Sequence, residues 1–180
     1  SEHQVTLKPR PVHGHEFGDH QDACDERLGV LGSETSHLVT LQTYRTEEPQ
    51  SEQRVVDNLA RARDYLNGLA EQFNRGQRTL KLEPFEWRRP GPTQTQWVFG
   101  FRLGSGPKKV AILTHLDTVP PGNADWRPFE PRVEVRDYRG AAQPFLVGRG
   151  AVDDKGPSIL GLIVMRALAK DREARFSTAR

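Results

Sequence analysis

Apolar side chains recur along residues 51–76 with the period of an α-helix. They stand at alternating steps of four and three, which places them on one stripe: Val55, Leu59, Ala62, Leu66, Leu69 and Phe73. Ser51 is a suitable N-cap for this helix and Gly76 a suitable stop. Gly68 lies inside the helix and lowers its intrinsic propensity by about 1 kcal/mol relative to alanine, without breaking the stripe.

Strand patterns follow this helix. Residues 97–103 alternate large apolar and other side chains with a period of two, which predicts a half-buried strand. Leu80 and Leu82 indicate a neighbouring strand, which Pro84 restricts to a sheet edge because proline donates no ladder hydrogen bond. The continuous apolar run at 110–113 is typical of a central strand that is covered on both faces.

The remaining elements complete an α/β pattern. Residues 145–147 suit a strand, residues 158–170 a helix that is apolar on most sides, and residues 38–44 a short helix. Helices and strands mixed in this way predict an α/β layered domain over residues 36–180. Residues 1–35 are poor in large apolar side chains, and we expect them to form a polar, flexible leader.

Charge and composition narrow the classes of function. The chain has 180 residues with 26 basic and 24 acidic side chains, a formal net charge of +2, and no basic stripe interleaved with aromatics. We therefore expect no nucleic-acid partner. No apolar run approaches the roughly 20 residues that span a bilayer, so no membrane partner is expected either. Cys24 is the only cysteine, which excludes an internal disulfide and fits a reducing, cytoplasmic location.

The first candidate site follows the apolar run at 110–113. Residues two apart in extended backbone point the same way, so His115 and Asp117 share a face. A neutral imidazole is a good zinc ligand, and its other ring nitrogen needs an acceptor that fixes the tautomer. Asp117 supplies that acceptor or shapes the local field, and the spacing leaves both roles open. Open α/β sheets bind ligands at the carboxyl ends of strands, although His and Asp are also ordinary loop residues there.

The second candidate site is the glycine-rich stretch 148–156. Asp153 and Asp154 are adjacent carboxylates, which repel each other unless a cation neutralises them, and either Lys155 or a metal ion could do so. The alternative is a solvated turn whose acidic side chains cap the next helix. The residue after Lys155 is glycine where a phosphate-binding loop needs Ser or Thr, and the Gly-Arg-Gly turn does not continue as a dinucleotide fingerprint. Both nucleotide motifs therefore fail.

Three blocks stand in order along the chain: His115-Leu116-Asp117-Thr118-Val119-Pro120, Trp126-Arg127-Pro128-Phe129 and Gly148-Arg149-Gly150-Ala151-Val152-Asp153-Asp154-Lys155-Gly156. In this order and spacing they resemble the M20 metallopeptidase family, which includes carboxypeptidase G2-like enzymes, succinyl-diaminopimelate desuccinylase, acetylornithine deacetylase, aminoacylase and related dipeptidases. The resemblance implies the N-terminal part of a three-layer, zinc-exopeptidase-like α/β catalytic domain with a mixed, mostly parallel sheet, without the family's lid domain.

The resemblance also implies roles for individual residues. It implies that His115 binds one zinc ion, that Asp153 bridges two, and that Asp117 is a catalytic residue supporting the site. It further implies a cis peptide bond after Asp153. Four residues are expected to support the site: Arg149, Gly150, Asp154 and Lys155. Two Zn²⁺ ions, or Co²⁺ or Mn²⁺ in their place, would activate a water and polarise the scissile carbonyl, with a glutamate further along the chain as general base.

The family's substrates are dipeptides, C-terminal residues of peptides and N-acyl amino acids, and its lid domain implies a homodimeric parent protein. We expect the 180-residue chain to be inactive alone and to bind zinc weakly, because the general base and the remaining ligands are not found in it. One alternative is a non-catalytic binding protein that keeps the fold, and another is a nucleotide-binding α/β domain. His13, His15, His20 and Cys24 fit no compact zinc motif and are assigned to the leader.

Overall fold

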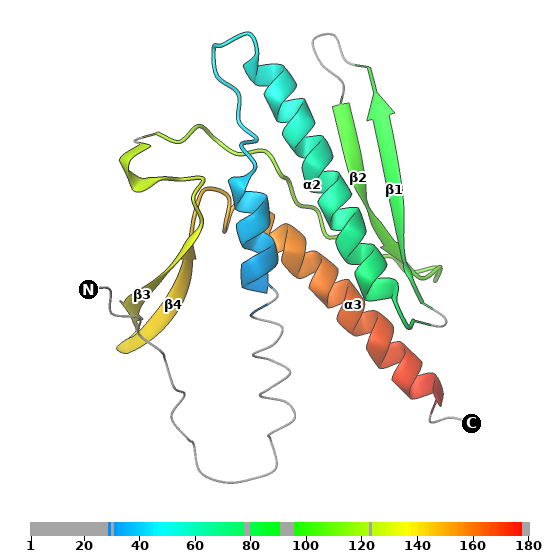
Figure 1. Ribbon diagram of the computed structural model, residues 1–180. Coiled ribbons are helices and arrows are strands. Elements are labelled where there is room, and N and C mark those ends of the chain that lie inside the picture. The colour runs from blue at the N-terminus through cyan, green and yellow to red at the C-terminus, as the bar shows by residue number, and fades with distance from the viewer. Residues whose placement is uncertain (1–28, 30, 78–79, 91–95, 123, 178–180) are drawn as a thin grey trace.

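Two long helices and two β-hairpins make up most of the chain that the computed structural model describes, namely residues 29, 31–77, 80–90, 96–122 and 124–177 (Figure 1). In chain order the elements are a helix over residues 31–40, α2 (Ser51–Asn74), β1 (Leu82–Arg89), β2 (Gln96–Leu103), the 3-10 helix η1 (Ala124–Trp126), β3 (Arg132–Tyr138), β4 (Ala141–Val147) and α3 (Lys155–Ser177). The helices lie between the two hairpins. No helix in this part of the chain is long and apolar enough to cross a membrane.

Helix α2 confirms the predicted apolar stripe. Five of the six stripe residues are buried: Val55, Ala62, Leu66, Leu69 and Phe73. Ser51 is not the N-cap, however. Gln50 holds that position without a side-chain hydrogen bond, and Ser51 Oγ donates to the carbonyl of Thr46 at 2.9 Å. The helix ends at Asn74, and Gly76 follows with a φ of +80°, a left-handed conformation that glycine adopts at low cost.

Gly68 gives the first testable prediction, because it lies inside α2 and a Cβ added there would meet no atom within 4 Å. Gly68→Ala is expected to raise the free energy of unfolding by about 0.5 to 1 kcal/mol, since alanine loses less backbone entropy than glycine on entering a helix. Urea denaturation followed by circular dichroism measures this change. A loss of stability would show that the helix is more crowded at this point than the structure indicates.

Both sheets are antiparallel, so the prediction of a mostly parallel sheet is wrong for the described residues. Leu82 of β1 lies opposite Leu103 of β2, and Arg132 of β3 lies opposite Val147 of β4. Pro84 stands in β1, which has one partner strand and is therefore an edge, as predicted. Two antiparallel strands can be joined by a short turn, as in both hairpins here, whereas two parallel strands need a long crossover connection between them.

The apolar run at 110–113 is the main departure from the predicted strands. It is extended but belongs to neither sheet, and the side chains of Val110 and Leu113 are 94% and 89% exposed. The prediction of a central strand covered on both faces is therefore wrong for the described residues. Apolar composition shows only that a segment can be buried. Burial as a central strand requires neighbouring strands in the same sheet and a layer of structure on each face, and the described residues do not provide this arrangement.

Two further features differ from the sequence-based expectations. Strand β3 was not predicted, although Val133 and Val135 alternate with charged residues over 132–136, which is a strand pattern. The helix over residues 31–40 begins within the segment assigned to the leader, and its Thr35 is buried. Residues 1–28 lie outside the described part, and so do the histidines and the cysteine assigned to the leader.

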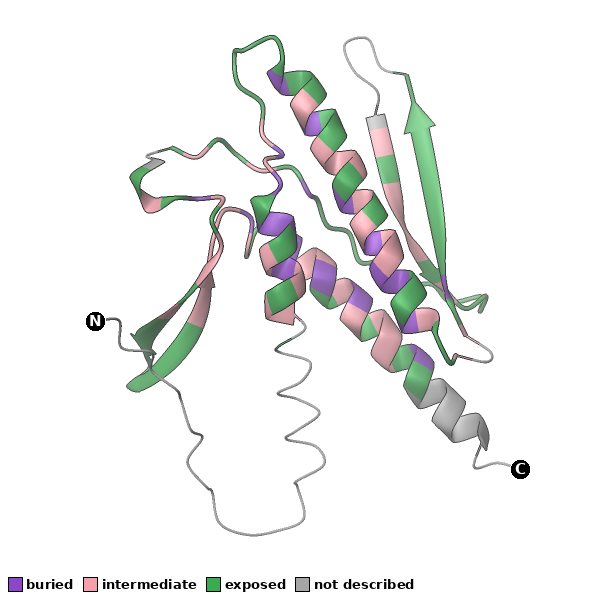
Figure 2. Ribbon diagram, viewed as in Figure 1, coloured by how far each residue is buried: buried purple, intermediate pink, exposed green. Residues whose placement is uncertain are grey.

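The apolar core lies between the helices and includes residues next to the two candidate site segments. Buried residues concentrate on the helices, while the two hairpins consist mainly of exposed and half-buried residues (Figure 2). The core contains the stripe of α2 together with side chains from the other helices and from the extended segment: Leu38, Leu41, Leu116, Ile159 and Leu162. Leu116 thus anchors the segment that carries His115 and Asp117, and Ile159 and Leu162 anchor the helix that follows Asp153.

Candidate metal site

The two blocks that carry the candidate ligands meet in the folded chain. His115 lies on the extended segment after residue 113, and Asp153 lies in the loop between β4 and α3. The imidazole Nε2 of His115 is 3.0 Å from Oδ1 of Asp153. Both side chains are accessible, with 49% and 86% of their surface exposed. Folding therefore brings together two good metal donors that are 38 positions apart, and leaves them open to solvent.

Asp117 lies on the other ring nitrogen of His115. The Nδ1 atom is 3.0 Å from the carbonyl oxygen of Asp117 and 3.4 Å from its Oδ1. Since both of these groups only accept hydrogen bonds, they favour the tautomer in which Nδ1 carries the proton. The lone pair of Nε2 then points at an anionic oxygen of Asp153, an arrangement that a shared cation or a second proton on the ring stabilises.

The pKa of His115 reflects the same arrangement. Partial burial by itself lowers the pKa of the imidazole, but the carbonyl of Asp117 and the carboxylates of Asp117 and Asp153 outweigh it. The net effect raises the pKa of His115 above its ordinary value. The site therefore attracts positive charge to the imidazole, and a divalent cation would experience the same field.

Asp154 links the two blocks, because its side chain accepts a hydrogen bond from the backbone of His115. Its Oδ2 accepts a hydrogen bond from the backbone N–H of His115 at 3.3 Å, and the peptide bond between Asp153 and Asp154 is cis, as the family resemblance implies. Its carbonyl accepts hydrogen bonds from the backbone N–H and the hydroxyl of Ser158 at 3.0 and 2.9 Å, in the first turn of α3. Asp154 thus connects the histidine segment directly to the start of this helix.

Lys155 does not neutralise the two carboxylates, which corrects one of the two alternatives left open by the sequence. Its side chain is buried and its Nζ donates to the carbonyl oxygen of Leu41 at 2.6 Å. Burial lowers the pKa of Lys155 to about 8, because desolvation disfavours the charged form. Lys155 is therefore excluded as the counterion of the acidic pair, while a metal ion and a solvated turn without a counterion both stay open.

The lowered pKa of Lys155 predicts a pH dependence of stability. Between pH 8 and 10.5 the unfolded chain binds more protons at this group than the folded chain, so its contribution makes stability rise with pH across that window. Below pH 8 the full cost of burying the charge is present. We expect the difference in unfolding free energy between the wild type and Lys155→Met to rise from pH 8 to 10.5. Urea midpoints measured at several pH values test this, and a flat or falling difference contradicts it.

Glycines allow the loop from 148 to 156 to pack closely. Gly150 has a φ of +85°, and a Cβ there would lie 2.9 Å from Cδ of Lys155. A Cβ on Gly156 would lie 2.1 Å from the carbonyl oxygen of Ala151, closer than any atom can approach without a shift. The predicted supporting role of Gly150 therefore has a steric basis in its contact with the lysine stem, and Gly156 lets the loop close on its own backbone.

Arg149 supports the loop from its outer side. Its backbone N–H donates to the carbonyl of Pro128 at 2.6 Å, and its guanidinium donates to the carbonyl of Pro121 at 3.1 Å. The guanidinium also lies over the ring of Trp126, 5.2 Å from the ring centroid. Arg149 thus connects the middle block of the sequence to the loop that carries Asp153, and it contacts neither candidate ligand directly in these bonds.

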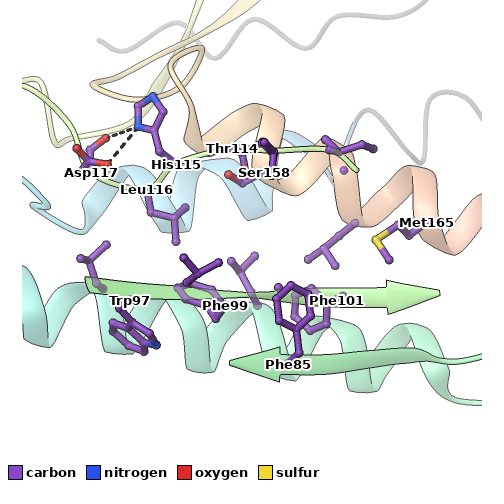
Figure 3. Close-up of a pocket in the computed structure, with 18 residues that line it drawn as sticks. Phe85, Trp97, Phe99, Phe101, Thr114, His115, Leu116, Asp117, Ser158 and Met165 are labelled. Carbon is purple, nitrogen blue, oxygen red and sulfur yellow. Dashed lines mark hydrogen bonds and ion pairs between the residues drawn. The ribbon is translucent and has the colours of Figure 1, made fainter. Parts of the chain in front are cut away.

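Two hollows lie beside the segment around residue 115, and His115 and Asp117 line both of them. Side chains alternate there, so Leu116 points toward β2 while His115 points to the other side (Figure 3). The hollow below Leu116 has a volume of about 350 Å³ and a mostly apolar lining that includes Phe99, Phe101 and Met165. The second hollow, of about 440 Å³, is lined by both candidate ligands and by Asp117, Trp126, Arg136 and the glycine-rich loop. A substrate beside His115 and Asp153 would occupy the second hollow.

The described residues do not contain a complete metal centre. Among them, no group of three or more His, Cys, Asp or Glu side chains is placed to hold a metal ion together. Arg136, which lines the hollow, was not singled out from the sequence, and its strand β3 was not predicted either. The hollow is lined by no glutamate, so the general base implied by the family resemblance does not come from its described lining.

Comparison with known proteins finds a family model that matches part of the chain. Residues 111–177 match the model of Peptidase family M20/M25/M40, in agreement with the resemblance of the three sequence blocks. "Putative dipeptidase YtjP" of Bacillus subtilis (strain 168) is 32% identical over 74 residues, which is 41% of this chain and 14% of the relative. A "Putative dipeptidase" of Staphylococcus aureus (strain USA300) is 36% identical over 66 residues, which is 36% of this chain and 12% of the relative. The chain thus matches only a small part of the length of these relatives. None of the solved structures matches it.

Proposed function

We propose that the native protein containing this chain hydrolyses an amide or peptide bond in a small substrate with the help of zinc. The observation that carries the proposal is the 3.0 Å approach of His115 Nε2 to Asp153 Oδ1 at the edge of an accessible hollow. The family match over residues 111–177 supports it. The names of the matching relatives favour a dipeptide over an N-acyl amino acid or the C-terminal residue of a longer peptide.

The donors present fit a zinc ion. An imidazole nitrogen and a carboxylate oxygen are ordinary zinc ligands, and here they face each other across a distance that a proton or a metal ion would bridge. His115 and Asp153 would hold the metal, and Asp153 has a second carboxylate oxygen for a further ion. When bound, zinc lowers the pKa of its water and polarises a carbonyl. Cobalt and manganese accept the same donors and are the alternative metals.

The chain's own residues have separate tasks in this proposal. The carbonyl oxygen of Asp117 accepts a hydrogen bond from Nδ1–H of His115, and the lone pair of Nε2 is then free for the metal. Asp154 holds the backbone of His115 in place, and the glycine-rich loop presents Asp153. Trp126 and Arg136 line the hollow that would receive the substrate, and they exclude part of the surrounding water from it.

A substrate panel tests the proposal. The native protein is assayed with dipeptides, N-acyl amino acids and a longer peptide, after removal of metal with a chelator and after addition of Zn²⁺, Co²⁺ or Mn²⁺. We expect amide hydrolysis that is lost with the chelator and restored by metal, with dipeptides cleaved fastest. Metal binding without hydrolysis of any substrate would instead support a non-catalytic binding protein, and no metal binding would refute the site.

A further inference from the structure

A short segment outside the family match contacts both blocks of the candidate site. It comprises residues 41–43, which follow the helix over residues 31–40, and we call it the bridging segment. The hydroxyl of Thr43 donates to the carbonyl of Leu116 at 2.5 Å, and the carbonyl of Thr43 accepts from the backbone N–H of Thr118 at 3.0 Å. The carbonyl of Leu41 accepts from Nζ of Lys155 at 2.6 Å. One short segment therefore bonds to the histidine block twice, through the hydroxyl and the carbonyl of Thr43, and to the aspartate block once, through the carbonyl of Leu41.

These three hydrogen bonds are shielded from water. Leu41 is 2% exposed, and Thr43 and Lys155 are each 1% exposed. A hydrogen bond in such surroundings is stronger than the same bond at the surface, and losing one partner leaves the other buried and unsatisfied. The bonds thus fix the backbone of the two blocks more firmly than exposed contacts such as that between His115 and Asp153 could.

The three hydrogen bonds of the bridging segment are made to residues that stand close in the sequence to the candidate ligands. The two bonds of Thr43 hold the residues on either side of Asp117, one of them directly after His115. The bond from Lys155 holds the residue that follows the Asp153–Asp154 pair. A shift of the bridging segment would therefore move the imidazole and the carboxylate relative to each other.

We propose that the bridging segment is a positioning element that sets the separation of His115 and Asp153, with Thr43 and Lys155 as its positioning residues. The catalytic meaning of this separation rests on the proposed function, but the positioning itself does not. The simpler reading, in which Thr43 only satisfies a nearby carbonyl, accounts for one bond. It does not account for three hydrogen bonds from Leu41 and Thr43, two positions apart, to two blocks that are 37 positions apart, from Thr118 to Lys155.

Amide hydrogen exchange in the metal-free chain tests the positioning directly. The N–H of His115 bonds to Asp154 across the two blocks, and the N–H of Thr118 bonds to Thr43, so their exchange rates report the two contacts. Thr43→Val keeps the shape of the side chain and removes the hydroxyl. We expect it to speed the exchange of both amides about tenfold, the effect of losing roughly 1.4 kcal/mol of local hydrogen bonding. Thr43→Ser restores the hydroxyl and should restore both rates.

Two further variants make the test specific. Thr40→Val is the matched control, because the hydroxyl of Thr40 is exposed and donates to the carbonyl of His37, three residues earlier, away from both blocks. Both rates should therefore stay within about twofold of the wild type. Lys155→Met removes the bond to the aspartate block alone. It should speed exchange at the N–H of His115 and leave that of Thr118 unchanged, and it tests the proposal if Thr43→Val does not fold.

The outcomes separate this proposal from the proposed function. The positioning role is overturned if Thr43→Val leaves both amides unchanged, or if it speeds the amide of Leu162 in α3 equally, which would indicate general destabilisation. In the native protein, Thr43→Val should also weaken Zn²⁺ binding about tenfold, with rescue by Thr43→Ser. If the amides respond as expected while the wild type binds no zinc, the positioning element stands and the metal site fails.

Discussion

Replacing His115 by alanine is expected to weaken Zn²⁺ binding by the native protein more than about 100-fold, because removing a ligand costs at least as much as the 10- to 100-fold loss seen for its outer partners. The structure places Nε2 of this histidine 3.0 Å from Oδ1 of Asp153. Asp153→Asn, which keeps the shape and removes the charge, should have a similar effect. Competition with a chromophoric chelator measures the affinity, and hydrolysis of a dipeptide should fall in parallel.

His37→Ala is the matched control for this prediction. His37 stacks on the ring of Tyr65 with 3.9 Å between centroids, and it is not part of the lining of the hollow beside Asp153. Its loss should leave zinc affinity unchanged while lowering stability modestly. If His37→Ala weakens zinc binding as much as His115→Ala, the loss reflects general unfolding. If neither variant weakens it, the metal lies elsewhere.

Replacing Gly156 by alanine is expected to lower the free energy of unfolding by about 2 to 4 kcal/mol, the range typical of severe steric conflict. The new Cβ would lie 2.1 Å from the carbonyl oxygen of Ala151. That oxygen is part of the backbone, so the strain cannot be relieved by rotating a side chain, and the loop must move. Since Asp153 lies between these two residues, metal affinity should fall together with stability, as urea denaturation and chelator competition would show.

Gly161→Ala provides the comparison for Gly156→Ala. Both glycines lie in α3, but a Cβ on Gly161 would meet its nearest atom, Cγ2 of Ile112, at 3.9 Å, which is ordinary contact. This variant should raise the free energy of unfolding by about 0.5 to 1 kcal/mol, as alanine usually does in a helix. Equal destabilisation by both substitutions would mean that α3 tolerates no added methyl group, and that the close approach at Ala151 has no special role.

Elements with a strong local signal could be predicted from the sequence. The stripe of α2 and the alternation of β2 depend on the periodicity of neighbouring residues, and both elements are present in the structure. The prediction of a mostly parallel sheet came from the family resemblance. Such a sheet depends on pairing between segments far apart in the chain, and the periodicity of neighbouring residues gives no information on that pairing. The run at 110–113 shows the difference, because its composition is that of a buried strand while its surroundings in the described chain leave it exposed.

Some residues of the candidate site could also be predicted from the sequence, and others could not. His115 and Asp153 could be singled out because their residue types and flanking glycines form recognisable blocks, and the structure brings them together. The hydrogen-bond partner of Lys155 could not be predicted, because every residue has a backbone carbonyl and the sequence does not distinguish that of Leu41. Thr43 was missed for a related reason, since one threonine after an apolar helix is common and its importance lies in a contact 73 positions away.

The hairpin of β3 and β4 occupies the stretch of chain between the two blocks, and its tip lies far from them (Figure 1). Arg139 and Gly140 at this tip are exposed and have φ values of 55° and 79°, a tight two-residue connection. Lengthening a surface loop costs little free energy, about 0.6 kcal/mol for each doubling of its length. Because the histidine and aspartate blocks are held through residues 41–43 and through Asp154, the tip can accept insertions while the two candidate ligands keep their places. Variation in chain length among proteins that share these blocks is therefore expected to accumulate at this turn.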